Sequence, residues 1–428
     1  MVNSAEKMIE FVHASPSPFH CAWEASKMLV AAGFTRVREG DEVTDVSRAK
    51  GFRIRNGAVI AWIKGQQQPS EGGFRLVGAH TDSPNIRIKP RPEYSSSGYI
   101  QWGVERYGGP ILATWTDRDL GISGRVALRG KDGKVKTALV KIDRPVARIP
   151  NVAIHYNREV NREGLKLNVQ KHLPPIIGLG GETEGDAILR DLIVESLTAD
   201  GRAWVQSDIL GWDLGLHDLQ KPSLGGINNE FIFAPRMDNQ FSCFAALQAM
   251  VDIENPKQTA IMALFDHEEV GSQSDSGAKS ALLEQTLKIL VPDGKVEMAM
   301  ARSFMLSVDM AHGVHPNYAD YHDPQHRPRI NGGPVIKTNV NMRYATDALG
   351  AAKFKLACEA EGVDCQDHIH RSDLACGSTV GPITAAGLAI RTVDIGCAML
   401  SMHSIREMAG ADDIDMLSRV LKRVLAEG

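Results

Sequence analysis

The chain has 428 residues, 43% of them apolar, which is enough for a large buried core in one or more domains. Charged residues make up 23% and nearly cancel to a net charge of −4, which argues against a nucleic-acid surface or a polybasic membrane anchor. No apolar run approaches the ~20 residues that span a bilayer. We therefore expect a chain that binds neither nucleic acid nor membrane.

The start of the chain lacks the basic and then apolar segments of a secretory signal peptide. None of the six cysteines forms a C-x-x-C pair, and all lie in apolar or mixed segments. They are Cys21, Cys243, Cys358, Cys365, Cys376 and Cys397. We interpret them as reduced, mostly buried residues of a cytoplasmic protein.

The N-terminal segment predicts two helices and then two strands. Helical spacing over residues 5–14 is interrupted by Ser-Pro-Ser-Pro and resumes over 21–33. Short apolar runs follow, AVIAWI from Ala58 and FRLVGA from Phe74, and each predicts a strand.

The middle of the chain, 86–233, has a different pattern. Apolar residues alternate over 99–142, and Lys131-Asp132-Gly133 is a turn sequence, so this part predicts β-hairpins. The Gly- and Pro-rich segment 172–186 predicts a surface loop.

From about residue 234 helices and strands alternate again. Residues 238–253 predict a helix with one apolar side, and 414–428 predict an amphipathic helix. The runs TAIMALF, FMLSVDM and LAIRTVDI are typical of strands buried on both faces.

The economical interpretation is one α/β domain, 1–85 and 234–428, interrupted by an inserted β-rich domain, 86–233. Three sequential domains are the alternative, but the first α/β piece would then have no sheet to join.

Candidate metal ligands follow several predicted strands, where sites form in open α/β sheets. In VGAHTDSP, His80 ends a strand, and Asp82 can hold the other ring nitrogen of a ligating imidazole. A turn with a satisfied histidine is the alternative. In APRMDNQ, Asp238 is either a carboxylate that bridges two cations or a helix N-cap.

In FDHEEVGS, two glutamates directly follow a strand and would repel each other without a cation or solvent. We assign Glu269 to a metal and leave Glu268 as a general base, with a solvated surface pair as the alternative. Asp309 ends the next strand and is a further ligand, and His403 is the last nitrogen ligand. The tract after Asp309 supplies more histidines than one site needs: His312, His315, His322 and His326.

The five ligands are a nitrogen and oxygen set for two cations, which suits zinc and tolerates manganese or cobalt. Two close cations would share a water, lower its pKa and polarise a scissile carbonyl. A two-metal deacylase or carboxypeptidase is a rival interpretation, and a binding protein with structural metals is another. Against the latter, structural zinc sites are usually closed and rich in cysteine.

Segments along nearly the whole chain resemble the aspartyl aminopeptidase family of co-catalytic metallopeptidases. They are GAHTDSP, TDRDLGISGRV, IPNVAIHYNREVN, RMDNQ, DHEEVGS, SVDMAHGVHPNY, GPVIKTNVNMRYAT, RSDLACGSTVGP and MHSIREM. The resemblance implies a mixed-sheet α/β metallopeptidase domain with helices on both faces, interrupted by a dimerisation domain. It also implies an enzyme that hydrolyses the N-terminal bond of peptides, with a preference for Asp or Glu.

Individual roles follow from the same resemblance. The implied metal ligands are His80, Asp238, Glu269, Asp309 and His403, with Asp238 bridging. Glu268 matches the general base, Asp82 the carboxylate that supports His80, and His155 a histidine that a neighbouring subunit inserts. The implied substrate-binding residues are Lys337, which faces an acidic side chain, and Tyr344, Gly377, Ser378 and Thr379. The family assembles as a tetrahedral dodecamer built from dimers.

Overall fold

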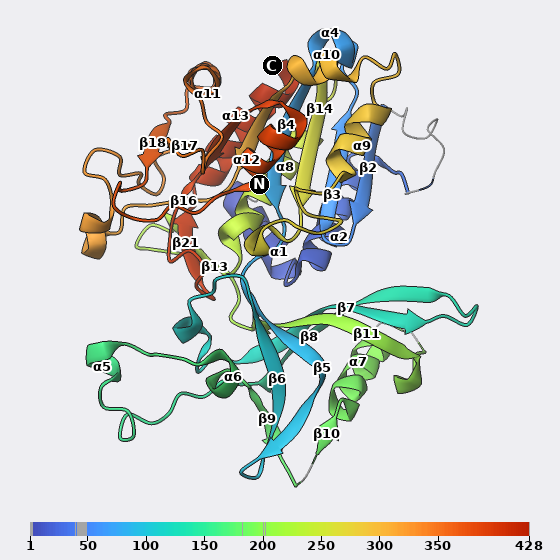
Figure 1. Cartoon of the computed structure of the whole chain (residues 1–428), viewed down its shortest axis with the longest axis vertical. Helices are drawn as coiled ribbons and strands as arrows, with labels where there is room; N and C mark the ends of the chain where they lie inside the picture. Colours follow the sequence, from blue (N-terminus) through green and yellow to red (C-terminus); the bar gives the residue numbers. More distant parts are fainter. Residues whose placement is uncertain are drawn as a thin grey trace. The chain divides into compact units, whose positions relative to one another are not determined.

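The computed structural model describes residues 3–38, 40, 49–181, 183–199, 201 and 203–427, which divide into two compact units (Figure 1). Unit 1 comprises Met1–Ser83, Pro222–Met402 and Glu407–Gly428, and unit 2 comprises Pro84–Lys221 and His403–Arg406. The long segment of unit 2 ends earlier than the predicted limit at 233, because the residues from Pro222 onward form strands that pair within unit 1.

Among the described residues, nine strands of unit 1 form one sheet. Their order is β1 (Thr35–Arg36), β2 (Lys50–Arg55), β3 (Ala58–Ile63), β14 (Thr259–Phe265), β4 (Phe74–His80), β15 (Phe304–Val308), β19 (Arg391–Gly396), β17 (Val335–Thr338) and β18 (Gln366–Ile369). Strands that precede the segment Pro84–Lys221 in the chain and strands that follow it thus belong to the same sheet. The neighbours β14, β4, β15 and β19 are parallel, whereas β3 and β17 run antiparallel to them, so the sheet is mixed.

Helices cover both faces of this sheet, and the alternation along the strands shows why. In β14, Ala260, Met262 and Leu264 belong to one apolar cluster, while Ile261, Ala263 and Phe265 belong to another. The first cluster includes side chains of α1 (Ser4–Ala14), α2 (Pro18–Ala31), α8 (Met237–Val251), α11 (Ala348–Ala360) and α13 (Asp413–Glu427). The second includes side chains of α9 (Leu282–Ile289), α10 (Val296–Ala301) and α12 (Val380–Leu388).

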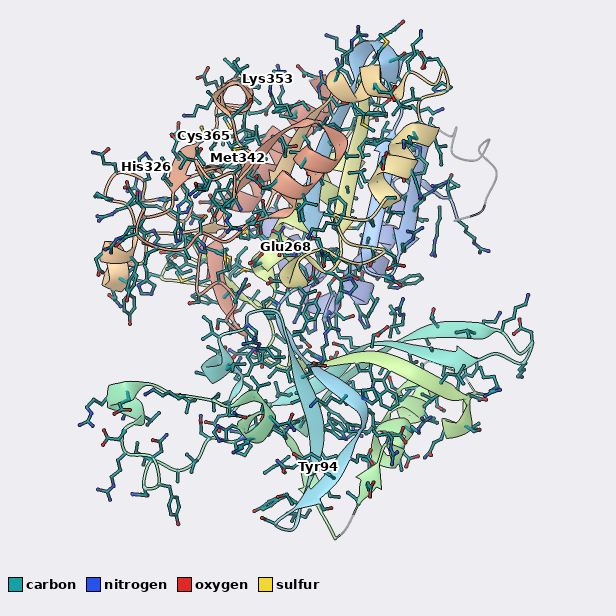
Figure 2. All side chains as sticks on the ribbon, in the orientation of Figure 1. Tyr94, Glu268, His326, Met342, Lys353 and Cys365 are labelled. Carbon is teal, nitrogen blue, oxygen red and sulfur yellow. The ribbon has the colours of Figure 1, made fainter. Side chains whose placement is uncertain are left out.

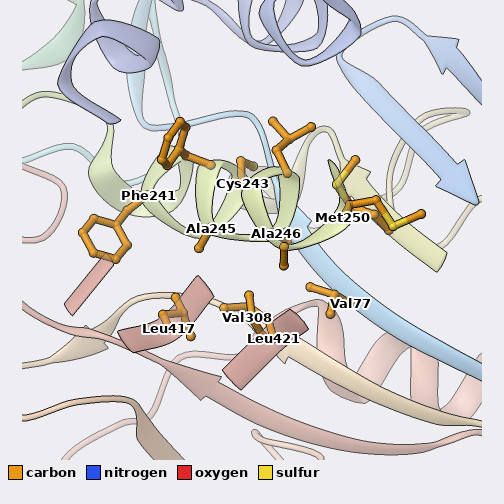
Figure 3. Close-up of a cluster of buried hydrophobic side chains, with 14 of the residues drawn as sticks. Val77, Phe241, Cys243, Ala245, Ala246, Met250, Val308, Leu417 and Leu421 are labelled. Atoms are coloured by element: carbon orange, nitrogen blue, oxygen red, sulfur yellow. The ribbon is translucent and has the colours of Figure 1, made fainter. Parts of the chain in front are cut away.

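The helix α8 is buried on nearly all sides, although its sequence predicted one apolar side. It packs against α1, α2, α13 and β4, so its small residues are enclosed as well as its large ones. Figure 3 shows this part of the core, with the labelled residues Val77, Phe241, Cys243, Ala245, Ala246, Met250, Val308, Leu417 and Leu421.

A smaller sheet of unit 1 contains β12 (Ser223–Gly225), β13 (Phe231–Ala234), β21 (Glu407–Gly410), β20 (Ala398–Leu400) and β16 (Ala311–His312). The strand predicted from Leu388 begins only at Arg391, because α12 extends to Leu388 and Ala389 has a left-handed backbone, with φ of 53°. His403 was expected after the last strand. It lies instead between β20 and β21 in the chain.

Unit 2 is built on an antiparallel sheet. Its strands are β8 (Val135–Ala147), β7 (Leu120–Arg129), β11 (Ile209–Asp218), β5 (Asn85–Ser96), β6 (Tyr99–Tyr107), β9 (Ile176–Leu179) and β10 (Glu184–Gly185), the last pairing with β5. The predicted loop 172–186 is wrong for its described residues, since β9 and β10 lie there and pair with β6 and β5. Prolines and glycines around such short strands hid them in the sequence.

A helix that the sequence analysis missed, α7 (Ala187–Ala199), places Leu189, Ile193 and Leu197 in the core of unit 2. The short helices are α4 (Pro69–Gly72), α5 (Val160–Glu163), α6 (Val169–His172) and the 3₁₀ turns η1 (Leu112–Trp115), η2 (Gln206–Asp208), η3 (Glu268–Val270) and η4 (Pro316–Tyr321). No helix in the described part of the chain has both the length and the apolar character needed to cross a membrane.

Leu421 tests the packing of α13 because its side chain is fully buried in the cluster that includes α8. Leu421→Ala should lower the free energy of unfolding by about 2–5 kcal/mol, since it removes buried methyl groups and leaves a cavity. Chemical denaturation measures the change. The exposed neighbour Lys422 is the control, and Lys422→Ala should shift stability by less than about 0.5 kcal/mol. Equal denaturation midpoints for Leu421→Ala and Lys422→Ala would contradict the packing of Leu421 in the core.

Candidate metal centre

Acidic and histidine side chains gather at one edge of the large sheet. The parallel strands β14, β4 and β15 all end at this edge, with His80 as the last residue of β4 and Asp309 directly after β15. The turn η3 follows β14 and carries Glu268 and Glu269. Figure 2 shows Glu268 at this end of the strands. Residues far apart in the sequence therefore meet because parallel strands share a carboxyl edge.

The imidazole of His80 is at the centre of this group and is only 2% exposed. Its Nε2 lies 3.4 Å from Asp238 Oδ1 and 3.5 Å from Asp309 Oδ1. Burial lowers the pKa of His80, but the neighbouring carboxylates of Asp238, Asp309 and Asp82 outweigh burial and raise that pKa well above its usual value. The three ligand atoms of His80, Asp238 and Asp309 lie within 4.8 Å of one another, as a metal site requires.

The backbone around Asp238 aims its carboxylate at His80. The N-cap of α8 is Arg236, and the helix is kinked at Asp238, whose backbone is non-helical with φ of −81° and ψ of 99°. The N–H of Asp238 donates to Glu407 Oε2 at 3.1 Å, and its carbonyl accepts from Ser83 Oγ at 2.6 Å. These two hydrogen bonds hold the backbone N–H and carbonyl groups of Asp238, and its carboxylate lies beside the imidazole of His80.

Asp82 holds the turn that carries the glutamates. It is fully buried, and its two carboxylate oxygens accept the backbone N–H groups of Glu268 and Glu269, each at 3.1 Å. The sequence predicted that the Asp82 carboxylate would hold His80. In the structure the carbonyl oxygen of Asp82 lies nearer to His80 Nδ1, at 3.0 Å, and its Oδ1 lies at 3.4 Å. Asp82 therefore orients both the imidazole and the glutamates.

Glu268 lies in a crowded acidic environment. Burial raises its pKa to about 8; His80 opposes the shift, and Asp309, Glu269 and Asp82 add to it. The ligand atoms of His80, Glu268 and Glu269 also lie within 4.8 Å of one another. So many carboxylates around one imidazole suit divalent cations, whose charge would favour the ionised forms. The donors are the nitrogen and oxygen ligands that zinc accepts.

Lys337, on β17, is 2% exposed, so it is not a surface lysine. Its Nζ lies 3.2 Å from Asp309 Oδ2, 3.3 Å from the Met310 carbonyl oxygen and 5.1 Å from the centre of the Tyr344 ring. The structure thus places Lys337 and Tyr344 side by side, next to the cluster around His80.

The segment before α12 contains Gly377, Ser378 and Thr379. Ser378 Oγ donates to the carbonyl oxygen of Arg343 at 3.2 Å, and Thr379 Oγ1 donates to Asp394 and accepts from the first turn of α12. Asp394 also accepts the N–H of Ala345 at 2.6 Å. Through Arg343 and Asp394 this segment is therefore attached to the chain on either side of Tyr344.

Two predicted site residues belong to unit 2. His155 lies on an exposed turn after β8, and His403 begins the segment His403–Arg406, where its Nδ1 lies 3.0 Å from the Gly109 carbonyl oxygen. Their assignments as an inserted histidine and a metal ligand stay predictions.

The sequence analysis missed Ser83 and Glu407, which hold the backbone of Asp238, and Asp394, which holds Thr379 and Ala345. Ser83 adjoins the motif of His80, and Asp394 is a carboxylate inside an apolar strand, which was the available clue. Of the histidines beyond those that one metal site needs, His326 is paired with a carboxylate: its Nδ1 lies 2.7 Å from Asp323 Oδ1.

A mixed sheet with imidazole and carboxylates at the ends of its parallel strands defines the chain as a metallohydrolase of the α/β class. Residues 11–424 match the family model described as aminopeptidase I zinc metalloprotease (M18). The chain therefore belongs to the M18 family of zinc metallo-aminopeptidases.

Known relatives match this chain over most of their length. A probable M18 family aminopeptidase 2 from Pseudomonas entomophila is 47% identical over 418 residues, which are 97% of this chain and 96% of the relative. A solved structure of the Ape4 and Nbr1 complex contains a chain with a TM-score of 0.95 and 35% identity, covering 99% of this chain and 85% of that one. The S. cerevisiae mApe1 dodecamer matches with a TM-score of 0.84 and 29% identity, over 98% and 95% of the two chains.

Asp82→Asn tests how the cluster is held. The substitution keeps the size of the side chain, but an amide NH₂ would face one of the two backbone N–H donors. Zinc affinity or turnover should fall by about 10–100-fold, the usual effect of losing a residue that orients ligands. Metal titration and initial rates measure this. Asp323→Asn is the control, because that carboxylate serves His326 and Gln325 instead. Unchanged affinity and rate would refute the role of Asp82.

Proposed function

We propose that the chain removes the N-terminal residue of peptides, with a preference for Asp or Glu, using two divalent cations and Glu268 as the general base. The cluster around His80 is the observation that carries this proposal. The ligands would be His80, Asp238, Glu269, Asp309 and His403, with Asp238 shared. Zinc is the native metal proposed, in agreement with the family description, and manganese or cobalt could replace it.

The cations, when bound, supply Lewis acidity for the scissile carbonyl and for the attacking water. Glu268 accepts the proton of that water and delivers it to the leaving nitrogen. Its fixed position supports this role, since Asp82 anchors the backbone N–H groups of Glu268 and Glu269. With both backbone positions held in this way, Glu269 would serve as a ligand and Glu268 as the base beside it.

Glu268→Gln should reduce kcat by about 10²–10⁴-fold, because the amide cannot accept a proton. The fold and the metal content should stay as in the parent chain, since the Asp82 contacts involve only the backbone at this position. Elemental analysis and circular dichroism are the controls. A rate near that of the parent enzyme, with metal bound, would exclude Glu268 as the base.

The acidic preference rests on Lys337. Its buried ammonium group lies beside the metal cluster, where a compact positive charge can attract the side chain of an N-terminal Asp or Glu. Tyr344 contributes its ring next to Lys337, and the segment from Gly377 to Thr379 borders the same region. This arrangement favours an acidic first residue over a neutral one.

Lys337→Leu should lower kcat/KM on N-terminal Asp and Glu substrates by about tenfold or more relative to Ala and Leu substrates. A panel of aminoacyl chromogenic substrates measures this ratio, and metal content is checked because Lys337 also contacts Asp309. In the parent enzyme all activity should vanish on chelation and return with zinc. Equal losses on acidic and neutral substrates would remove the preference but leave the aminopeptidase function intact.

We also propose that the chain forms a dodecamer from dimers in the cytoplasm, with unit 2 as the dimerisation domain. One similar structure is that of the S. cerevisiae mApe1 dodecamer. The turn that carries His155 exposes Val152, Ile154 and Tyr156, and exposed apolar groups are typical of a contact surface. His155 would then enter the site of a neighbouring subunit and stabilise the developing oxyanion. The free thiols of the six cysteines fit a reducing compartment.

A further inference from the structure

A cavity of about 300 Å³ in unit 1 is lined by histidines that the proposed mechanism does not use. The lining includes His312, His315, His322, His368 and His370, and among the described residues it contains no aspartate or glutamate. Of these, His312 follows the candidate ligand Asp309 by three residues in the chain. We call this cavity the histidine pocket.

Three of the imidazoles form a nearly equilateral triangle. The ring centres of His312 and His368 are 5.9 Å apart, those of His312 and His370 are 5.9 Å apart, and those of His368 and His370 are 6.0 Å apart. The rings are steeply inclined to one another, at 59–76°, so they do not stack face to face. All three rings border the pocket.

His368 is the most unusual member of the triangle. It is 2% exposed, yet neither of its ring nitrogens has a hydrogen-bond partner. A buried polar group without a partner is costly, and it calls for a water, an ion or a ligand at that position. His326 in the same region shows the contrast, because its imidazole is bound by Asp323 at 2.7 Å.

Lys337 is a positive charge that acts on both His312 and His368, and Asp238 and Asp309 oppose its effect on His312. Lys337 is opposite His368 in the β17–β18 register. Burial first, and then the positive neighbours, lower the pKa of His312 to about 4 and that of His368 to about 3. Both imidazoles are therefore neutral near pH 7, and each has one N–H to donate. Arg371 also lines the pocket, but its guanidinium group is engaged by Asp373 at 2.7 Å.

We propose that the histidine pocket binds a carboxylate group of the peptide substrate, as a second recognition site beside the metal centre. This inference rests on the proposed aminopeptidase function. A carboxylate would accept the N–H that His368 cannot donate within the chain. A transition metal fits less well because, in the described chain, the ligand atoms of this triangle do not converge within 4.8 Å.

The source of the carboxylate can be an acidic side chain or a free C-terminus, and paired substrates distinguish them. One pair carries Glu or Gln as the second residue, and the other ends in a free carboxylate or an amide. Each pair is assayed with the parent enzyme and with His368→Leu at a fixed zinc concentration. His326→Asn is the matched control, since that histidine does not line the pocket.

For at least one pair, His368→Leu should lower kcat/KM on the acid about tenfold while changing the amide less than twofold. Its thermal stability should be equal or higher, because the substitution removes two unpartnered nitrogens. If that variant fails to fold, the partly exposed His370→Leu should show the same selective loss.

Equal effects on acids and amides in both pairs would overturn the proposal. So would a bound zinc equivalent that disappears in His368→Leu, since the pocket would then be a metal site. Absence of activity on every substrate in the parent enzyme would instead refute the proposed function, which keeps the two failures distinct.

Discussion

The imidazole of His80 lies among carboxylates that cannot all stay ionised at so short a distance without a compensating charge. The surrounding fold keeps them there. Asp82 anchors the turn of Glu268 and Glu269, and Glu407 and Ser83 fix the backbone of Asp238. These hydrogen bonds hold the acidic groups close together, as expected for a site built to bind cations.

The parts of the fold that the sequence predicted are those in which one local pattern decides the structure. Continuous apolar runs such as Thr259–Phe265 can be stable only as strands covered on both faces, and that is where β14 lies. Because such strands are parallel and adjacent, the polar residues that follow them had to meet at one edge. For this reason His80, Glu269 and Asp309 could be proposed together before any contact was known.

The rest depended on contacts between distant segments. Nothing local shows that the Asp82 carboxylate accepts two N–H groups more than 180 residues away in sequence, at a separation of 186 for Glu268. The short strands β9 and β10 are stabilised by pairing with β6 and β5, and their own sequences favour a loop. The histidine pocket combines residues of β16 and β18, which are separated by the whole of β17 and α11 in the chain.

The position of unit 2 within the chain also has a consequence for biosynthesis. His80 precedes the inserted segment Pro84–Lys221, and Asp238, Glu269 and Asp309 all follow it. On the ribosome the first of these residues emerges long before its partners, and unit 2 has time to fold in between, because synthesis adds only about 5–20 residues per second. The nascent polypeptide thus cannot assemble the cluster of His80, Asp238, Glu269 and Asp309 until most of its length has been translated, and binding of an ion by these residues would come late in synthesis.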